Sequence, residues 1–211
     1  MEIYSFESLP STQRWLLDRL AEGAVTPPCA VIADRQTQGI GSRGNRWIGR
    51  PGNFFASVAL KKSDLPGDLP LSAASIYFAY LMRMTLFETG SKVWLKWPND
   101  FYLKDRKIGG CITTVKGDAA VAGIGLNLVD APRNFGVLDI DITPETLLRR
   151  YLDQLKKGWT WKQIFSRYRL EFEQSRAFCT HWGEEEIDMA EALLNEDGSL
   201  TIGNRRVVSR R

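Results

Sequence analysis

Residues 93 to 128 contain four short β-forming segments in close succession, and this feature most constrains the fold. The segments are 93–97, 101–103, 107–115 and 119–128. Strands separated by such short turns pair antiparallel, because a parallel pair needs a long crossover between its strands. Lys116, Gly117 and Asp118 supply the turn of a hairpin between the last two segments.

Helices are expected to flank this sheet. They are predicted from Ser11 to about Gly23, over residues 71–88, from Thr143 and from Thr160. Ser11 and Thr143 are suitable N-cap residues, and Pro144 suits the first helical position. With further strands at 30–33 and 54–60, the pattern predicts an α/β fold, in which a mixed, largely antiparallel sheet is flanked by helices.

A different pattern begins at Gly183. Short β-like pieces are interrupted there by turn sequences at 196–198 and 203–204. Gly, Asn and Asp favour tight turns at such positions. We therefore predict a large α/β domain over residues 1–182 and a small C-terminal β domain over residues 183–211.

The composition limits the classes of function. The chain has 211 residues, of which 44% are hydrophobic and 25% charged, and its net charge is +3. This charge is too small to indicate nucleic-acid binding by itself. No apolar run approaches the ~18 residues that a membrane span needs, and no signal peptide is evident. The composition favours a cytoplasmic protein without membrane or DNA partners.

The cysteines and the histidine do not form a metal-binding pattern. Cys29, Cys111 and Cys179 are far apart, and His181 has no cysteine partner at zinc spacing. Cys29 and Cys111 stand among apolar neighbours, so buried free thiols are expected. A reduced intracellular compartment fits this usage.

The charged residues between 96 and 110 suggest chemistry. Lys96 and Lys107 stand on either side of Asn99 and Asp100 in the stretch KWPNDFYLKDRKIGG. A carboxylate that can hold a metal and a lysine that can bind phosphate suit nucleotide chemistry. From residue types alone, a solvated hairpin with charged edges is the alternative.

Four motifs together resemble those of the biotin protein ligases. They are STQRWL at 11–16, the glycine-rich stretch at 36–60, KWPND with DRKIGG at 96–110, and GIGLNL at 123–128. They occur in the family's order and at similar spacing. The resemblance implies a catalytic domain like that of class II aminoacyl-tRNA synthetases. It also implies an SH3-like C-terminal barrel, which could be truncated in this chain.

The same resemblance implies a two-step ligase reaction. Biotin would be activated with ATP to biotinyl-5′-AMP and then transferred to a lysine of the biotin carboxyl carrier protein of acetyl-CoA carboxylase. Because biotin and ATP are both anionic, the site must neutralise charge and align the attack. The implied cofactors are ATP and Mg²⁺, and a homodimer is left open.

Site residues are assigned by matching the family motifs. For biotin they are Ser11, Thr12, Gln13, Gln36, Gly39, Gly41, Arg43, Trp47, Lys107 and Gly109. For the nucleotide they are Gly41, Ser42, Arg43, Trp47, Asn53, Asp100, Lys107 and Asn127. Lys107 and Arg43 are assigned to catalysis and Asp100 to Mg²⁺. Gln13 replaces the family's usual asparagine.

The glycine-rich loop departs most from the family pattern. Its glycines and Trp47 match, but Ile40, Ser42 and Asn45 replace the family's three arginines. Arg43 stands one place beyond the second of these. We therefore expect Arg43 to carry an unusual share of adenylate binding, because arginine clamps phosphate oxygens best.

Simpler roles remain open for several of these residues. Ser11 could act only as an N-cap, Trp47 could be a core residue, and Asn53 could be a turn residue. Lys107 could be a solvated hairpin lysine. Asn127 lies in an apolar strand, where an unpaired amide would cost about 1–3 kcal/mol.

Three other functions are weighed against biotin ligation. A lipoate or octanoyl ligase would share the fold. A DNA-binding repressor would need an N-terminal helix-turn-helix, and the Ser11 motif is expected to lie too close to Met1 for one. A non-catalytic biotin-binding module would be compatible with the altered loop.

Overall fold

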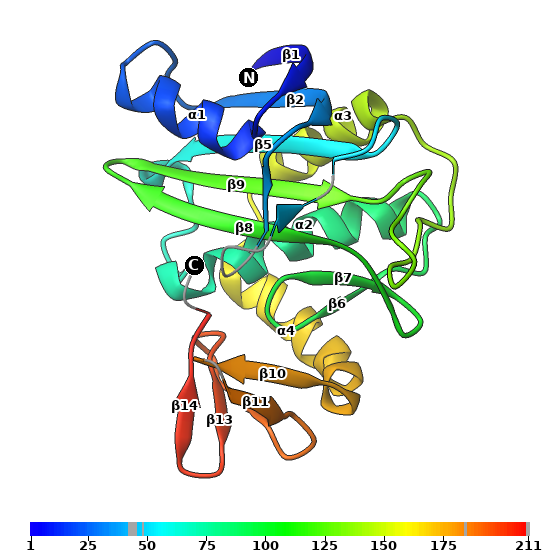
Figure 1. Cartoon of the computed structure of the whole chain (residues 1–211). Helices are drawn as coiled ribbons and strands as arrows, with labels where there is room; N and C mark the ends of the chain where they lie inside the picture. The colour runs from blue at the N-terminus through cyan, green and yellow to red at the C-terminus, as the bar shows by residue number, and fades with distance from the viewer. Residues whose placement is uncertain (42–45, 48, 184, 210–211) are drawn as a thin grey trace.

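A computed structural model describes residues 1–41, 46–47, 49–183 and 185–209. Its centre is a seven-stranded sheet (Figure 1). The strands are β1 (Glu2–Leu9), β2 (Cys29–Gln36), β5 (Phe54–Lys61), β6 (Trp94–Lys96), β7 (Asp100–Leu103), β8 (Arg106–Lys116) and β9 (Ala119–Leu126). Their order is β1-β2-β5-β9-β8-β7-β6, and only β1 and β2 pair in parallel. The predicted mixed, largely antiparallel sheet is confirmed.

Helices cover both faces of the sheet. Their bounds are α1 (Thr12–Ala21), α2 (Ala74–Glu88), α3 (Pro144–Lys156) and α4 (Trp161–Glu171). In Figure 1, α1 lies in front of the sheet and α2 behind it. The alternation of side chains along β2 explains the two layers: Val31 packs with Leu16 of α1, whereas Ile32 belongs to the larger core around α2.

Side-chain caps define the starts of three helices, and those at Ser11 and Thr143 were predicted. The Ser11 hydroxyl accepts a hydrogen bond from the Arg14 N–H at 3.4 Å, and the Thr143 hydroxyl accepts one from Thr146 at 3.3 Å. Thr160 forms a capping box with Gln163. Each such cap stabilises its helix by about 1 kcal/mol, so local sequence fixes these ends.

Two parts of the sheet structure were not predicted from the sequence. Strand β1 was missed, although Tyr4 and Phe6 pack on Trp15 of α1 with ring centroids 5.2 and 5.0 Å away. The stretch 36–53 was expected to be a loop. It contains a short ladder in which β3 (Gly39–Ile40) pairs with β4 (Arg46–Trp47).

The C-terminal strands lie at one end of the α/β layers (Figure 1). They are β10 (Cys179–Trp182), β11 (Glu185–Asp188), β12 (Leu193–Leu194), β13 (Leu200–Ile202) and β14 (Arg205–Val207). The predicted boundary at 182/183 falls inside the β10–β11 hairpin. Leu200 and Val207 belong to the same hydrophobic core as α2. The division into two domains stays a prediction.

The thiols agree with the sequence analysis. Cys29 and Cys111 are buried, and Cys179 is half-buried. Burial, assisted by the charge of Glu2, raises the pKa of the Cys29 thiol to about 11. Within the described part of the chain, none of the helices is long and apolar enough to cross a membrane.

Candidate active site

A pocket of about 500 Å³, including space open to solvent, lies on the α1 face of the sheet. Its floor is formed at Gly123 and Gly125 of β9. A Cβ atom at Gly123 would lie 2.5 Å from the Gln13 Oε1 atom, and one at Gly125 would lie 3.0 Å from the Trp47 Nε1 atom. Glycine is needed at both positions because a side chain would fill the pocket.

The pocket brings together most of the predicted site residues that the structure describes. Those lining it are Ser11, Thr12, Gln13, Gln36, Gly41, Trp47, Asp100 and Lys107. Gly39, Asn53, Gly109 and Asn127 are not among its lining residues. Ser42 and Arg43 lie outside the described residues, so their assigned roles stay predictions.

One end of the pocket is polar and uncharged. The Gln36 Oε1 atom accepts hydrogen bonds from the backbone N–H of Thr12 at 2.7 Å and from its hydroxyl at 3.1 Å. The Ser57 hydroxyl donates to the Thr12 hydroxyl oxygen at 2.9 Å. These bonds tie α1 to β2 and β5, and hold the polar groups in fixed orientations.

Gln13 presents an unpaired acceptor to this end. Its Nε2 atom donates to the Val121 carbonyl at 3.2 Å and to the Thr114 hydroxyl at 3.4 Å, which sets the orientation of the amide. Its Oε1 atom is buried and has no hydrogen-bond partner among the described residues. Leaving a buried acceptor unpaired costs about 1–3 kcal/mol, so a ligand donor would be favoured here.

Trp47 covers the pocket from β4. Its ring meets Phe135 edge-on, with centroids 6.1 Å apart and an interplanar angle of 86°. The indole N–H is buried and finds no acceptor in the described part of the chain. Trp47 therefore offers both an aromatic surface and a free donor to a bound molecule.

The other end of the pocket is charged. The Lys107 ammonium lies 2.7 Å from the Asp100 Oδ1 atom, and the two side chains are 25% and 22% exposed. Asp100 begins β7 and faces Gly110 of β8, where a Cβ would lie 3.2 Å from the same oxygen. The pairing of β7 with β8 therefore places the Asp100 carboxylate next to the Lys107 ammonium.

Asn53 and Asn127, the two asparagines assigned to the nucleotide, do not line the pocket. They form hydrogen bonds to the segment after β9 instead. The Asn53 Oδ1 atom accepts from the backbone N–H groups of Leu128 at 2.9 Å and Val129 at 3.0 Å, and its Nδ2 atom donates to the Asp130 carbonyl at 2.7 Å. The Asn127 Nδ2 atom donates to the Gly136 carbonyl at 3.1 Å. Their assigned nucleotide contacts stay predictions.

Lys96 lies away from the pocket lining. Its ammonium is over the rings of Tyr102 and Phe178, at 5.6 and 5.3 Å from their centroids. Burial lowers the pKa of Lys96, although the nearby Asp100 carboxylate opposes this shift. Lys96 therefore packs as a cation on two aromatic faces.

Several pocket residues were absent from the sequence assignment. Asn99 lines the pocket, and its amide donates to the Cys111 carbonyl; its place in the KWPND motif was the available signal. Phe135 is not itself a lining residue but contacts Trp47, and it lies in an irregular segment, where no sequence pattern indicates this contact. Such contacts depend on tertiary structure alone.

The residues present suit a metal that arrives with a nucleotide. Asp100 is the one carboxylate among the described lining residues, and no group of three or more His, Cys, Asp or Glu in the described regions could hold a metal. Mg²⁺ commonly takes one or two protein carboxylates and completes its shell with phosphates and water. A single carboxylate fits that mode.

The comparisons with known proteins define the class. The model of the Biotin/lipoate A/B protein ligase family matches residues 5–128. This match covers more than half of the chain, and the chain belongs to that family. The matched residues, 5–128, include all four sequence motifs described above.

Individual relatives agree with this assignment. The chain is similar to the bifunctional ligase/repressor BirA of Escherichia coli, with 36% identity over 127 residues, 57% of this chain and 38% of that protein. It is also similar to the biotin–[acetyl-CoA-carboxylase] ligase of Mycobacterium tuberculosis, with 35% identity over 130 residues, 58% of this chain and 47% of that protein. The matches span less than half of these relatives.

Solved structures extend the likeness beyond the matched segment. Biotin acetyl coenzyme A carboxylase synthetase from Helicobacter pylori, solved with bound biotinylated ATP, superposes with a TM-score of 0.94. It has 40% sequence identity, over 98% of this chain and 99% of that chain. A biotin protein ligase from Leishmania major, at 23% identity and a TM-score of 0.71 over 94% of this chain and 93% of that chain, shares the fold.

Proposed function

We propose that this chain is an ATP-dependent biotin–protein ligase. It joins the carboxylate of biotin to the α-phosphate of ATP, releases pyrophosphate, and transfers the biotinyl group to a lysine of the biotin carboxyl carrier protein of acetyl-CoA carboxylase. The observation that carries this proposal is one pocket with an amide-and-hydroxyl end and a Lys107–Asp100 end. The full-length likeness to a protein that holds biotinylated ATP supports it.

The polar end suits the head group of biotin. A ureido ring presents one acceptor and two donors, which hydroxyl and amide groups can satisfy. The Gln13 Oε1 atom, buried and unpaired among the described residues, accepts one ureido N–H. The Ser11 hydroxyl already accepts from Arg14 as an N-cap, so its proton is free to be donated to the ureido carbonyl. Ser11 thus combines both roles considered for it.

The charged end suits the first chemical step. A carboxylate oxygen of biotin attacks the α-phosphorus of ATP, and the bond from that phosphorus to the bridging oxygen breaks as pyrophosphate leaves. The Lys107 ammonium attracts the biotin carboxylate and the α-phosphate oxygens, which lowers their repulsion. Asp100 holds the lysine in position at 2.7 Å.

Asp100 has a second proposed role. A Mg²⁺ ion bound to the ATP phosphates would take an oxygen of Asp100 as a ligand and would neutralise phosphate charge. A carboxylate has two oxygens, so Asp100 can pair with Lys107 through Oδ1 at 2.7 Å and also offer an oxygen to such an ion. Asp100 thus links the lysine to the nucleotide.

The second step needs no covalent enzyme intermediate. The acceptor lysine amine attacks the carbonyl carbon of the mixed anhydride, AMP leaves with the bonding electrons, and the amine loses a proton. Trp47 contributes an aromatic surface over the adenylate and an unpaired indole N–H within the described regions. This proposal also keeps the binding roles that were assigned from the family motifs to Gly39, Gly41, Ser42, Arg43, Asn53, Gly109 and Asn127.

The cellular setting is part of the same proposal. We place the enzyme in the cytoplasm, where cysteine thiols stay reduced. The small net charge of +3 supports the proposal that the protein does not bind DNA. A homodimer remains an expectation.

The direct test is biotin-dependent release of pyrophosphate from ATP by the purified chain, followed by biotinylation of the carrier protein. We expect both, and pyrophosphate release should depend on biotin. Release that proceeds equally without biotin would contradict the first step. Binding of biotin without any release would favour the non-catalytic module.

Ligand-induced shifts in melting temperature separate biotin from the other acids used by this family. A ligand that binds only the folded state stabilises it in proportion to its affinity and concentration. At equal concentrations, biotin should raise the melting temperature more than lipoate or octanoate. The reverse order would identify the lipoate or octanoyl alternative.

A further inference from the structure

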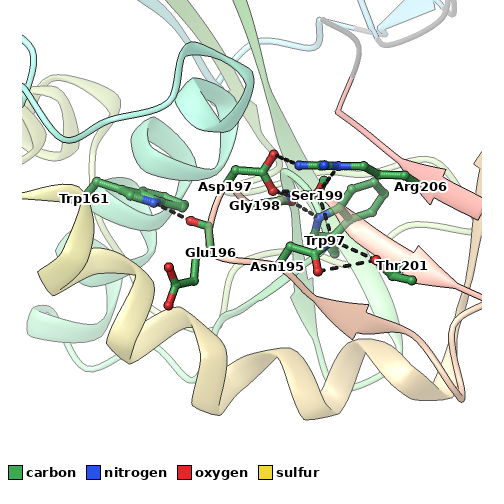
Figure 2. Close-up of polar contacts among 9 residues, drawn as sticks. All are labelled: Trp97, Trp161, Asn195, Glu196, Asp197, Gly198, Ser199, Thr201 and Arg206. Atoms are coloured by element: carbon green, nitrogen blue, oxygen red, sulfur yellow. Dashed lines mark hydrogen bonds and ion pairs between the residues drawn. The ribbon is translucent and has the colours of Figure 1, made fainter.

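The segment from Trp97 to Asp100 connects the pocket to the C-terminal strands. Asn99 and Asp100 line the pocket, whereas Trp97 is 3% exposed and lies in the hydrophobic core. The Trp97 indole N–H donates to the Gly198 carbonyl at 2.9 Å, across 101 positions of sequence (Figure 2). A group three residues before the catalytic carboxylate is therefore held by the C-terminal part of the chain.

The turn that contains Gly198 is internally braced. One Asp197 oxygen accepts from the Ser199 backbone N–H at 3.2 Å and from its hydroxyl at 2.6 Å, and the other pairs with Arg206 of β14 at 2.5 Å. Asn195 adds hydrogen bonds to Ser199 and Thr201, as Figure 2 shows. The turn 195–199 is thus a rigid support for the Gly198 carbonyl.

The same turn is docked against the helical layer. Gly198 has a φ of +79°, and a Cβ atom there would lie 2.9 Å from Ile76 and 3.0 Å from Ala73. The Trp161 indole N–H donates to the Glu196 carbonyl at 2.8 Å. Two tryptophans of the large core, Trp97 and Trp161, therefore each bond one carbonyl of this turn (Figure 2).

The backbone around Trp97 is held on its other side by the last residue of α4 and by the 3-10 helix Phe172–Ala177 that follows it. Strand β6 is the edge of the sheet, so its outer N–H groups need partners from elsewhere. The Trp97 N–H donates to the Ser175 hydroxyl at 3.1 Å, and the Leu95 N–H donates to the Glu171 carboxylate. On its inner side β6 pairs with β7, whereas on its outer side the side chains of Ser175 and Glu171 hold these two N–H groups.

We propose that the turn 195–199 positions Asp100 and Asn99 for adenylate formation through its hydrogen bond to Trp97. Trp97 is a positioning residue, because it does not line the pocket and acts through the two residues that do. The inference rests on the proposed ligase function. Displacement of reacting groups by about 1 Å can cost up to a hundredfold in rate, so a loosened anchor at Trp97 should appear in the chemical step.

A matched pair of substitutions isolates this role. Trp97→Phe and Trp161→Phe each remove one indole N–H bonded to the same turn, and both tryptophans are buried. The two variants should lose similar stability. For Trp97→Phe, the kcat of biotin-dependent pyrophosphate release should fall about tenfold, while the biotin Kd changes less than about twofold. For Trp161→Phe, kcat should stay within about twofold of wild type.

Equal kcat values in the two variants, or a loss confined to biotin affinity, would overturn the inference. If Trp97→Phe does not fold, Asp197→Ala provides the test, because it loosens the turn while Trp97 is intact. A kcat for Asp197→Ala that is lower than that of Trp161→Phe supports the inference, and an equal or higher kcat overturns it. Absence of activity in the wild-type chain would instead refute the proposed ligase function.

Discussion

The two ends of the pocket are built differently. The polar end joins α1, β2 and β5, three elements whose residues are far apart in sequence, through bonds such as that from Thr12 to Gln36. The charged end comes from the adjacent strands β7 and β8, where Asp100 and Lys107 are close in sequence and 2.7 Å apart in space. The difference implies a division of labour in which the first end binds and the second end performs chemistry.

The largest expected effect is at the charged end. Lys107→Ala should lower adenylate formation by about a hundredfold or more, because removal of one preorganised charged donor typically has this effect. Biotin affinity should fall less. Single-turnover measurement of biotinyl-5′-AMP formation at saturating biotin checks this. Near-wild-type turnover would show that Lys107 is a solvated hairpin lysine.

The next effect concerns Arg43 of the glycine-rich stretch, which lies outside the described residues. Arg43→Ala should weaken binding of a non-hydrolysable biotinyl-adenylate analogue by roughly tenfold, because charge-assisted bonds to phosphate contribute about 1.5–3 kcal/mol. Arg46→Ala serves as the control and should matter less. Isothermal titration measures both. Equal affinities for wild type and Arg43→Ala would assign phosphate binding to Arg46, Arg50 or backbone amides.

A similar or smaller loss is expected at the polar end. Gln13→Met removes the Oε1 acceptor and should weaken biotin binding by about five- to tenfold, the effect of one neutral hydrogen bond. The stability of the ligand-free protein should change little, since the lost bonds from Nε2 are offset by removal of an acceptor that is unpaired among the described residues. Titration and thermal unfolding measure the two quantities.

Gln13→Asn is the matched control for this change. It retains an acceptor but shortens the amide, so biotin affinity should lie between wild type and Gln13→Met. If Gln13→Met binds biotin as tightly as wild type, the Oε1 atom does not contact the ligand. The polar end would then depend on Ser11, Thr12 and Gln36.

The smallest effect should come from the thiols. Burial and Glu2 raise the pKa of Cys29 to about 11, so its thiol stays protonated at neutral pH and is a poor nucleophile. Replacement of Cys29, Cys111 and Cys179 by Ala or Ser should leave kcat within about twofold and reduce stability modestly. A biotinyl thioester detected on the wild-type protein by mass spectrometry would refute the two-step scheme.

The charged end was easier to predict than the polar end. Asp100 and Lys107 belong to one hairpin, whose turn and β-forming residues are visible in the sequence. The bonds that orient Gln13 involve Thr114 and Val121, which lie 101 and 108 positions away. Such contacts appear only when the sheet order is known.

The missed elements have the same physical origin. Strand β1 lies at the edge of the sheet beside β2 and has mixed exposure, so its sequence lacks the clear alternation of a half-buried strand. The 182/183 boundary was drawn from turn-forming residues and stays a prediction, and no sequence pattern indicated that Leu200 and Val207 belong to the same hydrophobic core as α2. Local sequence patterns identify helices and strands well. They give much less information on how those helices and strands pack together.

A double-variant cycle tests the division of labour most directly. Biotin Kd and the single-turnover rate of adenylate formation at saturating biotin would be measured for wild type, Gln13→Met, Lys107→Ala and the double variant. We predict that the double variant has the rate of Lys107→Ala within about twofold. Its loss of affinity should equal the product of the single losses within about twofold, as independent sites require. A saturated rate that falls about a hundredfold in Gln13→Met alone would contradict separate binding and chemical ends.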